Sequence, residues 1–138
     1  MANEVVVTTL LGNQGDPVEY TIATGTAGTN IAKGTIMKIS ASAQTIAAAS
    51  ADGDLIAGVL AEEHKGGVGQ TKISVLTHFI GETYSTTGMT LGQPQKIEEA
   101  NAVTDADDST IDNKMEACCL SLETVGATST GACLWNIG

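Results

Sequence analysis

The sequence lacks arginine and has few cations of any kind. Six lysines stand against sixteen acidic residues in 138, so the formal net charge is −10. Such a surface repels phosphate backbones and anionic lipid headgroups, which argues against nucleic acid and membranes as partners. No apolar run approaches the roughly 20 residues that span a bilayer, and no basic segment leads into an apolar one near the N-terminus. We therefore expect a soluble protein made without a Sec signal.

Aromatic residues are almost as scarce as cations. The chain has Tyr20, Phe79, Tyr84 and Trp135 and no others, although hydrophobic residues make up 42%. A chain of this length forms one ordinary domain and buries roughly two-thirds of the surface of its unfolded state. Its core is therefore expected to be aliphatic and thin.

The three cysteines fit no disulfide framework. Cys118 and Cys119 are adjacent and Cys133 stands apart. An odd number at this spacing matches neither a set of disulfides nor repeated C-x-x-C metal ligands. The expectation is three reduced, buried thiols that behave as small hydrophobic groups.

Glycine and β-branched residues, by contrast, are plentiful. Sixteen glycines and two prolines divide the chain into short segments rich in Val, Ile and Thr, which are typical of strands. The expected strands cover residues 5–11, 18–23, 34–40, 45–49, 55–60, 71–81 with an extension over 82–85, 114–122 and 132–137. Helical turns are expected over 95–100 and a long acidic loop over 101–113.

This pattern predicts a mainly β fold, a small β-sandwich or barrel-like domain with short helical turns. The β-rich domain is expected over residues 31–138, with residues 1–30 as an extended N-terminal arm or edge strands. Thr35, Met37 and Ile39 are expected to share the apolar face of their strand, since side chains alternate along a strand. Alternation over 71–77 likewise places Ile73 and Val75 together.

The glycine-rich segment 65–71 resembles the phosphate-binding loop of P-loop ATPases. In such loops the glycines let backbone N–H groups approach the phosphates, and a lysine neutralises their charge. Here Gln70 occupies the lysine position, and the chain from Thr71 onward alternates as a strand rather than opening a helix. The segment is therefore interpreted as a glycine-rich hairpin loop.

The acidic stretch has a partial calcium-binding pattern. Oxygen-bearing groups fall at the ligand positions of an EF-hand loop: Asp105, Asp107, Ser109, Ile111 through its carbonyl, Asn113 and Glu116. Thr110, however, stands where glycine makes the sharp turn, and the flanks do not form amphipathic helices. A solvated acidic loop is the favoured interpretation, and a calcium-dependent melting shift is what the alternative predicts.

Other chemistry-bearing residues form no organised site. Met37-Lys38-Ile39 is similar to the lysine hairpin of biotinyl carriers, but Lys38 lies mid-strand. His64 and His78 are the only histidines, and no serine lies in a nucleophile elbow. Their spacing from the cysteines matches no usual zinc pattern. We expect no catalytic residue, no cofactor, no metal and no enzymatic activity.

Three segments in order carry a family resemblance: 34–39, then 52–61, then 71–75 with a following Gly81. With closing strands over 116–120 and 132–137, this series resembles the small head-decoration proteins of tailed bacteriophages. The resemblance implies a structural virion protein, made in the host cytoplasm, that clamps the outer surface of an expanded capsid as a homotrimer. It further implies the major capsid protein as partner, contacted in part by the arm over residues 1–30.

An alternative stays open from the sequence alone. A ligand-binding β module, such as a carbohydrate-binding or adhesin domain of a fibre, would also be β-rich and would lack catalytic residues. Such modules present exposed aromatic rings to sugars, and Trp135 is the single tryptophan available for this role.

Overall fold

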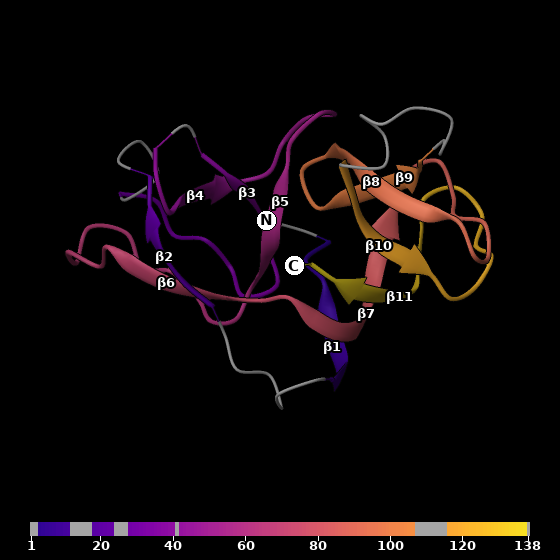
Figure 1. Cartoon of the computed structure of the whole chain (residues 1–138), viewed down its shortest axis with the longest axis horizontal. Helices are drawn as coiled ribbons and strands as arrows, with labels where there is room; N and C mark the ends of the chain where they lie inside the picture. The colour runs from indigo at the N-terminus through magenta and orange to yellow at the C-terminus, as the bar shows by residue number, and fades with distance from the viewer. Residues whose placement is uncertain (1–2, 12–17, 24–27, 41, 107–115, 138) are drawn as a thin grey trace.

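The computed structural model describes residues 3–11, 18–23, 28–40, 42–106 and 116–137, and strands dominate them (Figure 1). The strands are β1 (Val6–Leu10), β2 (Val18–Ile22), β3 (Ile36–Ile39), β4 (Thr45–Ala48), β5 (Ile56–Leu60), β6 (Lys72–Leu76), β7 (His78–Ser85), β8 (Pro94–Glu99), β9 (Ala102–Asp105), β10 (Ala117–Ser121) and β11 (Ser129–Asn136). The predicted mainly β, barrel-like fold is confirmed.

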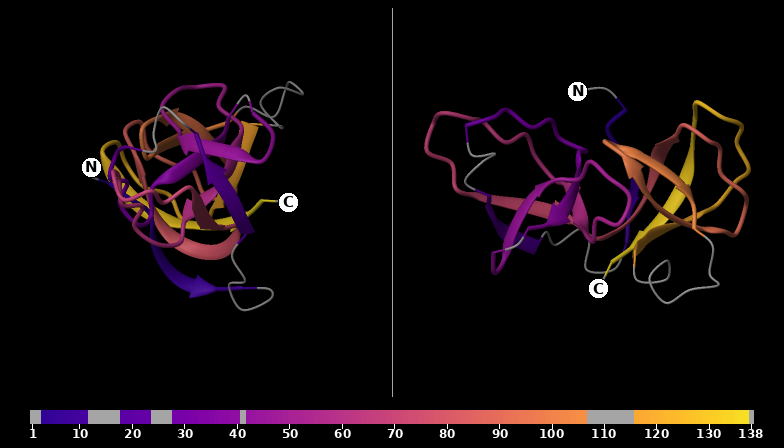
Figure 2. Two further views of the ribbon diagram at one scale, coloured as in Figure 1. Left: turned by 90° about the vertical axis from the view of Figure 1, so that its left-hand side faces the viewer. Right: turned by 90° about the horizontal axis from the view of Figure 1, so that it is seen from above.

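The strands divide into two lobes that lie side by side (Figure 1). In the barrel lobe, β2, β4, β3, β5 and β6 form a closed barrel in that order. In the ring lobe, the order is β1-β7-β11-β10-β8-β9, and a further pairing of β9 with β7 joins Ala102 to Tyr84. Five strands of the ring lobe therefore close on themselves, and β1 is added beside β7. Seen from above, β1 runs between the two lobes (Figure 2).

The interior of the barrel lobe is aliphatic, as the composition predicts. Its buried cluster consists of Ile22, Ile31, Met37, Ile46, Ala57, Leu60, Ile73 and Val75. Ile73 and Val75 share the buried face of β6, which confirms the alternation expected there. In this lobe the backbone of β5 at Gly58 lies very close to the backbone of β6 at Leu76. A Cβ at Gly58 would lie 2.6 Å from the Leu76 carbonyl oxygen.

The ring lobe is organised around the longest pairing of the molecule. β7 and β11 pair antiparallel over all eight residues of each strand, from His78 opposite Asn136 to Ser85 opposite Ser129. Inside, the rings of Phe79 and Trp135 stack with centroids 5.5 Å apart. The predicted closing pair is also confirmed, because β10 and β11 are antiparallel neighbours.

Apolar packing and hydrogen bonds join the two lobes. Ile36 and Val59 of the barrel lobe belong to the same buried cluster as Phe79 and Trp135. Beside them, the Ile36 N–H donates to Oδ1 of Asn101 over 2.9 Å. Burial of both groups makes this bond costly to lose, so the lobes are held as one unit.

The apolar face expected for β3 is wrong in one respect. Ile36 and Met37 are both fully buried, whereas Ile39 is 52% exposed. The reason is the position of β3 between two cores: Ile36 packs toward the ring lobe and Met37 into the barrel. The register of β3 against β5 also shifts between Met37 and Lys38, which interrupts simple alternation.

Two further expectations are wrong in the segment 95–105. The helical turns expected over 95–100 are replaced by β8, in which Gln95 and Ile97 are buried and Lys96 and Glu98 less so. The long loop expected from Asn101 instead begins with β9. Asn101 itself has a φ of 58° and makes the turn between these strands. Residues 107–113 of that loop lie outside the described residues.

Candidate binding surfaces

The loop that resembles a phosphate-binding segment is held by its own contacts. The backbone N–H of Lys65 donates to Oε1 of Gln70 over 3.0 Å, and that of Gly66 donates to Oδ1 of Asn30 over 2.8 Å. The strand β6 follows at Lys72, where a phosphate site would begin a helix. Its geometry is that of a stabilised hairpin loop.

The buried side chain of His64 lies against the same loop. Its side chain is fully buried, with Nδ1 3.0 Å from the Thr29 carbonyl oxygen and Nε2 3.1 Å from that of Gln70. Its backbone pairs with Ile31 in an isolated bridge. Both ring nitrogens are thus engaged by backbone oxygens, and neither faces a nucleophile. His78 lies half-buried on β7, outside this loop.

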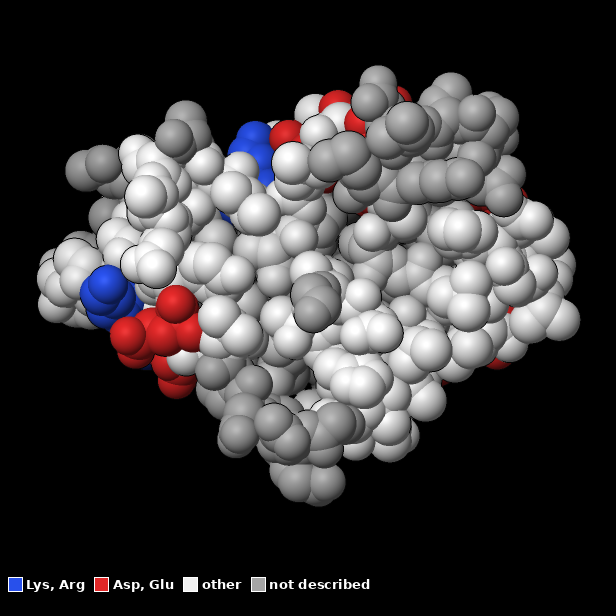
Figure 3. All heavy atoms as spheres, viewed as in Figure 1, with Lys and Arg blue, Asp and Glu red and all other residues white. Residues whose placement is uncertain are grey.

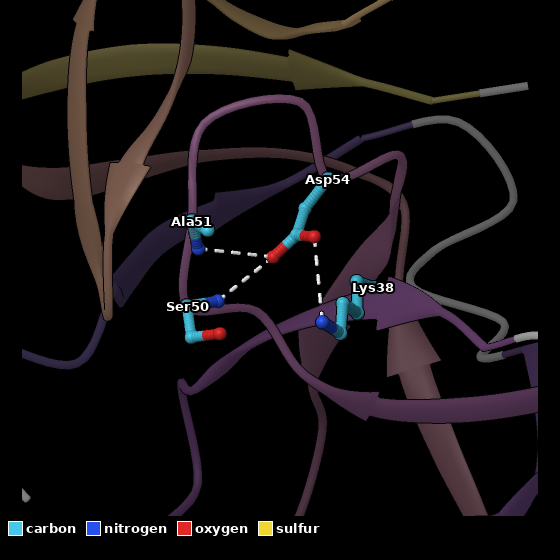
Figure 4. Close-up of polar contacts among 4 residues, drawn as sticks. All are labelled: Lys38, Ser50, Ala51 and Asp54. Carbon is cyan, nitrogen blue, oxygen red and sulfur yellow. Dashed lines mark hydrogen bonds and ion pairs between the residues drawn. The ribbon is translucent and has the colours of Figure 1, made fainter.

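Lys38 forms an ion pair that stabilises a turn, which is unlike the exposed position of an attachment lysine. Its Nζ lies 3.3 Å from Oδ1 of Asp54, whose other oxygen accepts from the backbone N–H groups of Ser50 and Ala51 over 2.9 and 3.0 Å (Figure 4). Burial raises the pKa of Asp54, but these N–H donors and the lysine outweigh it and hold the pKa below its ordinary value. A shallow pocket of about 470 Å³ adjoins the pair, rimmed by the exposed side chains of Ile39 and Leu55.

The cysteines are buried free thiols, as expected. Cys118 Sγ lies 3.9 Å from Cys119 Sγ, and Cys133 Sγ lies 3.5 Å from the sulfur of Met89. Burial, reinforced by the neighbouring thiols, raises the pKa of Cys119 well above its ordinary value. A thiol in this state is a poor nucleophile, and its surroundings are those of a core residue.

The described part of the acidic stretch makes protein contacts. Asp105 accepts hydrogen bonds from Gln95 Nε2 over 2.7 Å and from the N–H and hydroxyl of Thr90 over 3.0 and 2.7 Å. Glu116 lies 3.8 Å from Lys96 Nζ. Among the described residues no three His, Cys, Asp or Glu side chains gather as metal ligands. The other positions of the calcium pattern, from Asp107 to Asn113, lie outside the described residues.

Trp135 is placed in the core and not on the surface. It is fully buried against Phe79, and its Nε1 donates to Thr83 Oγ1 over 3.1 Å. The role considered for it in stacking on sugars is therefore wrong, because no ligand reaches the ring. This removes the residue on which a carbohydrate-binding module would depend.

An exposed surface without charged side chains lies along β1. Within the described residues β1 pairs with β7 alone, and Val6 and Leu10 are 61% and 46% exposed. Its free edge borders a cleft of about 400 Å³, here named the β1 cleft, lined by Val7, Thr8, Thr9, Leu10, Lys33, Ala61 and Leu76. In Figure 3 the surface over β1 and β7 is almost free of charged side chains.

Sequence reasoning did not single out this cleft, although one signal was present. The segment from Val5 to Leu11 carries no charge in a chain with sixteen acidic residues. Charged side chains usually prevent an edge strand from pairing with another chain. An uncharged edge strand therefore indicates a surface that binds a partner. The far wall of the cleft, by contrast, depends on Lys33, Ala61 and Leu76 meeting in the fold.

Among its described residues, these features define a two-lobed β protein whose β1 edge borders an open cleft. Within those residues, no helix has the length and apolar character needed to cross a bilayer.

In comparisons with known proteins, no family model matches the chain. No curated protein matches its sequence either. Its fold is similar to the N base of the head fibre protein gp8.5 of bacteriophage phi29, with a TM-score of 0.54. The likeness covers 87% of this chain and 92% of that one at 10% sequence identity. At this identity the comparison establishes a shared fold.

Proposed function

We propose that the chain is a structural protein of a bacteriophage head that binds the outer surface of an expanded capsid and stabilises it. The observation that carries this proposal is the likeness to the head fibre base, which extends over both lobes and nearly all of that chain. Likeness over a single barrel would be weak support, because small barrels serve many functions. A shared arrangement of two lobes is a more specific feature.

The physical character of the molecule supports a role in contact rather than in catalysis. The lobes are joined by a common core, so the chain presents a fixed surface to a partner. The residues considered for chemistry, Lys38, His64 and Cys119, are engaged in internal contacts or buried. A net charge of −10 keeps crowded copies from aggregating. We therefore propose a non-enzymatic protein that needs no cofactor.

We propose the major capsid protein as partner and a homotrimer as the bound form, as the resemblance to head-decoration proteins implies. The capsid contact is not assigned to a detachable N-terminal arm, because residues 18–22 form β2 of the closed barrel. Truncation through residue 23 would open that barrel, so it would test folding before binding. Surface substitutions on described residues are the sharper test.

Co-sedimentation with expanded heads tests the proposal directly. The chain should pellet with expanded heads at a saturable ratio, remain in the supernatant with unexpanded ones, and raise the temperature at which heads rupture. Size-exclusion chromatography with light scattering should give the mass of three copies. Failure to bind mature heads would refute the function, whereas a monomeric mass with retained binding would refute only the trimer.

A further inference from the structure

The edge of β1 that faces away from β7 is hydrogen-bonded to the barrel lobe just before the strand begins. Further along the strand, this edge borders the β1 cleft. The Val5 N–H donates to the Gly34 carbonyl oxygen of the barrel lobe over 2.8 Å. Gly34 permits this approach, because a Cβ there would lie 2.4 Å from the Val5 oxygen and its φ is +90°. Beyond Val5 the barrel lobe leaves the strand, and the β1 cleft lies between them.

Backbone donors point into this cleft. At the other end of β1, the Leu11 N–H donates to the His78 carbonyl oxygen, on the β7 side. Because neighbouring peptide groups of a strand point to opposite edges, the Leu10 N–H points away from β7 and toward the cleft. An open edge of this kind is a template for one more strand.

The lining of the cleft specifies the chemistry of such a strand. Leu76 and Ala61 form an apolar wall opposite β1, and Thr9 adds a hydroxyl group, whereas the Thr8 hydroxyl donates to the Ile80 carbonyl oxygen over 3.0 Å. Lys33 is the single charged lining residue; it is exposed and makes no ion pair within the described part of the chain. A segment with small or aliphatic side chains and one carboxylate complements all three features.

We propose that the β1 cleft takes an extended segment of a partner protein, which adds to β1 as a further strand and places a carboxylate against Lys33. This deepens the proposed function, on which it rests, by naming the surface that meets the partner. A second copy of the chain is the less suitable occupant, because each copy carries a charge of −10. The cleft also has a second wall on the barrel lobe, formed by Ala61 and Leu76, and such a two-walled cleft admits a single strand more readily than the edge of a folded lobe.

Peptide titrations on the full-length chain test the backbone part of the proposal. The probe is the blocked hexapeptide Thr-Val-Thr-Val-Thr-Glu, followed by NMR. It should shift the amide signals of residues 7–10, Lys33 and Leu76. The same peptide with alternate peptide nitrogens methylated cannot donate to the edge and should not bind. Equal binding of the methylated peptide, or no shift from the unmodified one at millimolar concentration, would overturn the proposal.

Matched variants separate the contribution of the β1 backbone to peptide binding from the contribution of the side chains. Leu10→Pro removes the donor that points into the cleft and should weaken the peptide by at least about tenfold. Leu10→Thr keeps the donor and changes only the lining side chain, so it should weaken the peptide less than Leu10→Pro does. The wild type should bind this glutamate-ended peptide more tightly than its lysine-ended counterpart, and Lys33→Glu should prefer the lysine-ended one. Each difference in affinity should be about two- to fivefold, the range of an exposed ion pair. Unchanged binding in Leu10→Pro with a native melting temperature would contradict strand addition.

The same variants distinguish failure of this inference from failure of the proposed function. If the wild type and Leu10→Pro pellet equally well with expanded heads, the cleft is not the docking surface and the function stands. If the peptide binds as expected but no variant pellets, the cleft is a strand-binding site and the function fails. Self-association of the wild-type chain that Leu10→Pro abolishes would show a second copy in the cleft and overturn the choice of occupant.

Discussion

The two lobes fill their interiors with different kinds of side chain. The barrel lobe is filled mainly by aliphatic side chains, with Tyr20 packed against them and with Thr45 and His64 as buried polar groups. The ring lobe contains an aromatic stack, three thiols and buried polar side chains: Thr83, Ser85, Gln95 and Ser121. An aliphatic interior demands only volume, whereas a buried polar group must find a specific partner. The barrel lobe is therefore specified mainly by its apolar pattern, and the ring lobe to a greater extent by particular contacts.

The largest expected effect distinguishes these two interiors. Trp135→Ala removes the stack on Phe79 and the donor to Thr83, so we expect a loss of about 3–5 kcal/mol in unfolding free energy. Ile46→Ala in the barrel interior should cost about 2–5 kcal/mol through its cavity alone. Urea unfolding followed by circular dichroism measures both. Hydrogen exchange should show the two lobes destabilised together in Trp135→Ala, because they share a core; loss of protection in the ring lobe only would contradict the shared core.

The junction between the lobes comes next in size. Asn101→Ala leaves the buried Ile36 N–H without its acceptor and puts alanine, which tolerates the left-handed region less well than asparagine, at a φ of 58°, so we expect a loss of about 2–4 kcal/mol. Asn101→Gly is the matched control, because it loses the same bond without backbone strain and should cost about 1–3 kcal/mol. Thermal and urea unfolding provide the measurement. If both variants are as stable as the wild type, the hydrogen bond does not secure the junction.

Within the described part of the chain, each lobe contains a carboxylate whose lowered pKa links stability to pH. Hydrogen bonds hold the pKa values of Asp54 and Asp105 below their ordinary range, despite burial that raises them. Their stabilisation is therefore complete above the unfolded pKa of about 3.9 and is lost as the pH falls through the lower folded value. Asp54→Asn should cost about 1–2 kcal/mol at neutral pH and flatten the acid side of the stability profile. Asp105→Asn should do the same to a smaller extent because Asp105 is exposed.

The smallest effect is expected at the ion pair that bridges the lobes on the surface. Lys96 Nζ lies 3.0 Å from Asp52, whose side chain is 64% exposed. The hydrogen bond to Asp52 raises the pKa of Lys96. Its contribution is thus present below the ordinary lysine pKa and is lost as the pH rises through the folded value. Asp52→Asn should cost about 0.2–1 kcal/mol at low salt and less at high salt, and an effect unchanged by salt would argue against an ionic origin.

The sequence predicted the fold class and most strand positions, because alternation is a local property. Ile73 and Val75 reveal the buried face of β6 without knowledge of any partner strand. The error at residues 95–99 has a tertiary cause: Gln95, Lys96 and the two glutamates favour a helix, but pairing of β8 with β10 and β9 overrides this preference. The two buried faces of β3 likewise depend on the second lobe.

The β1 cleft was harder to predict from the sequence than the fold was. The absence of charge over residues 5–11 can be read directly. The cleft itself requires Lys33, Ala61 and Leu76 to meet across the barrel lobe, and their distance along the chain gives no sign of this. The burial of Trp135 was equally hidden, since a single tryptophan near the end of a chain is as compatible with a binding site as with a core.

Electron cryomicroscopy of expanded heads incubated with the wild-type chain is the most direct test of the proposed function. We expect added two-lobed density at repeated positions on the outer surface, with β1 turned toward the capsid. We also expect that this density is lost with Leu10→Pro and kept with Leu10→Thr. Heads that show no added density at saturating concentrations of the folded chain would contradict the account.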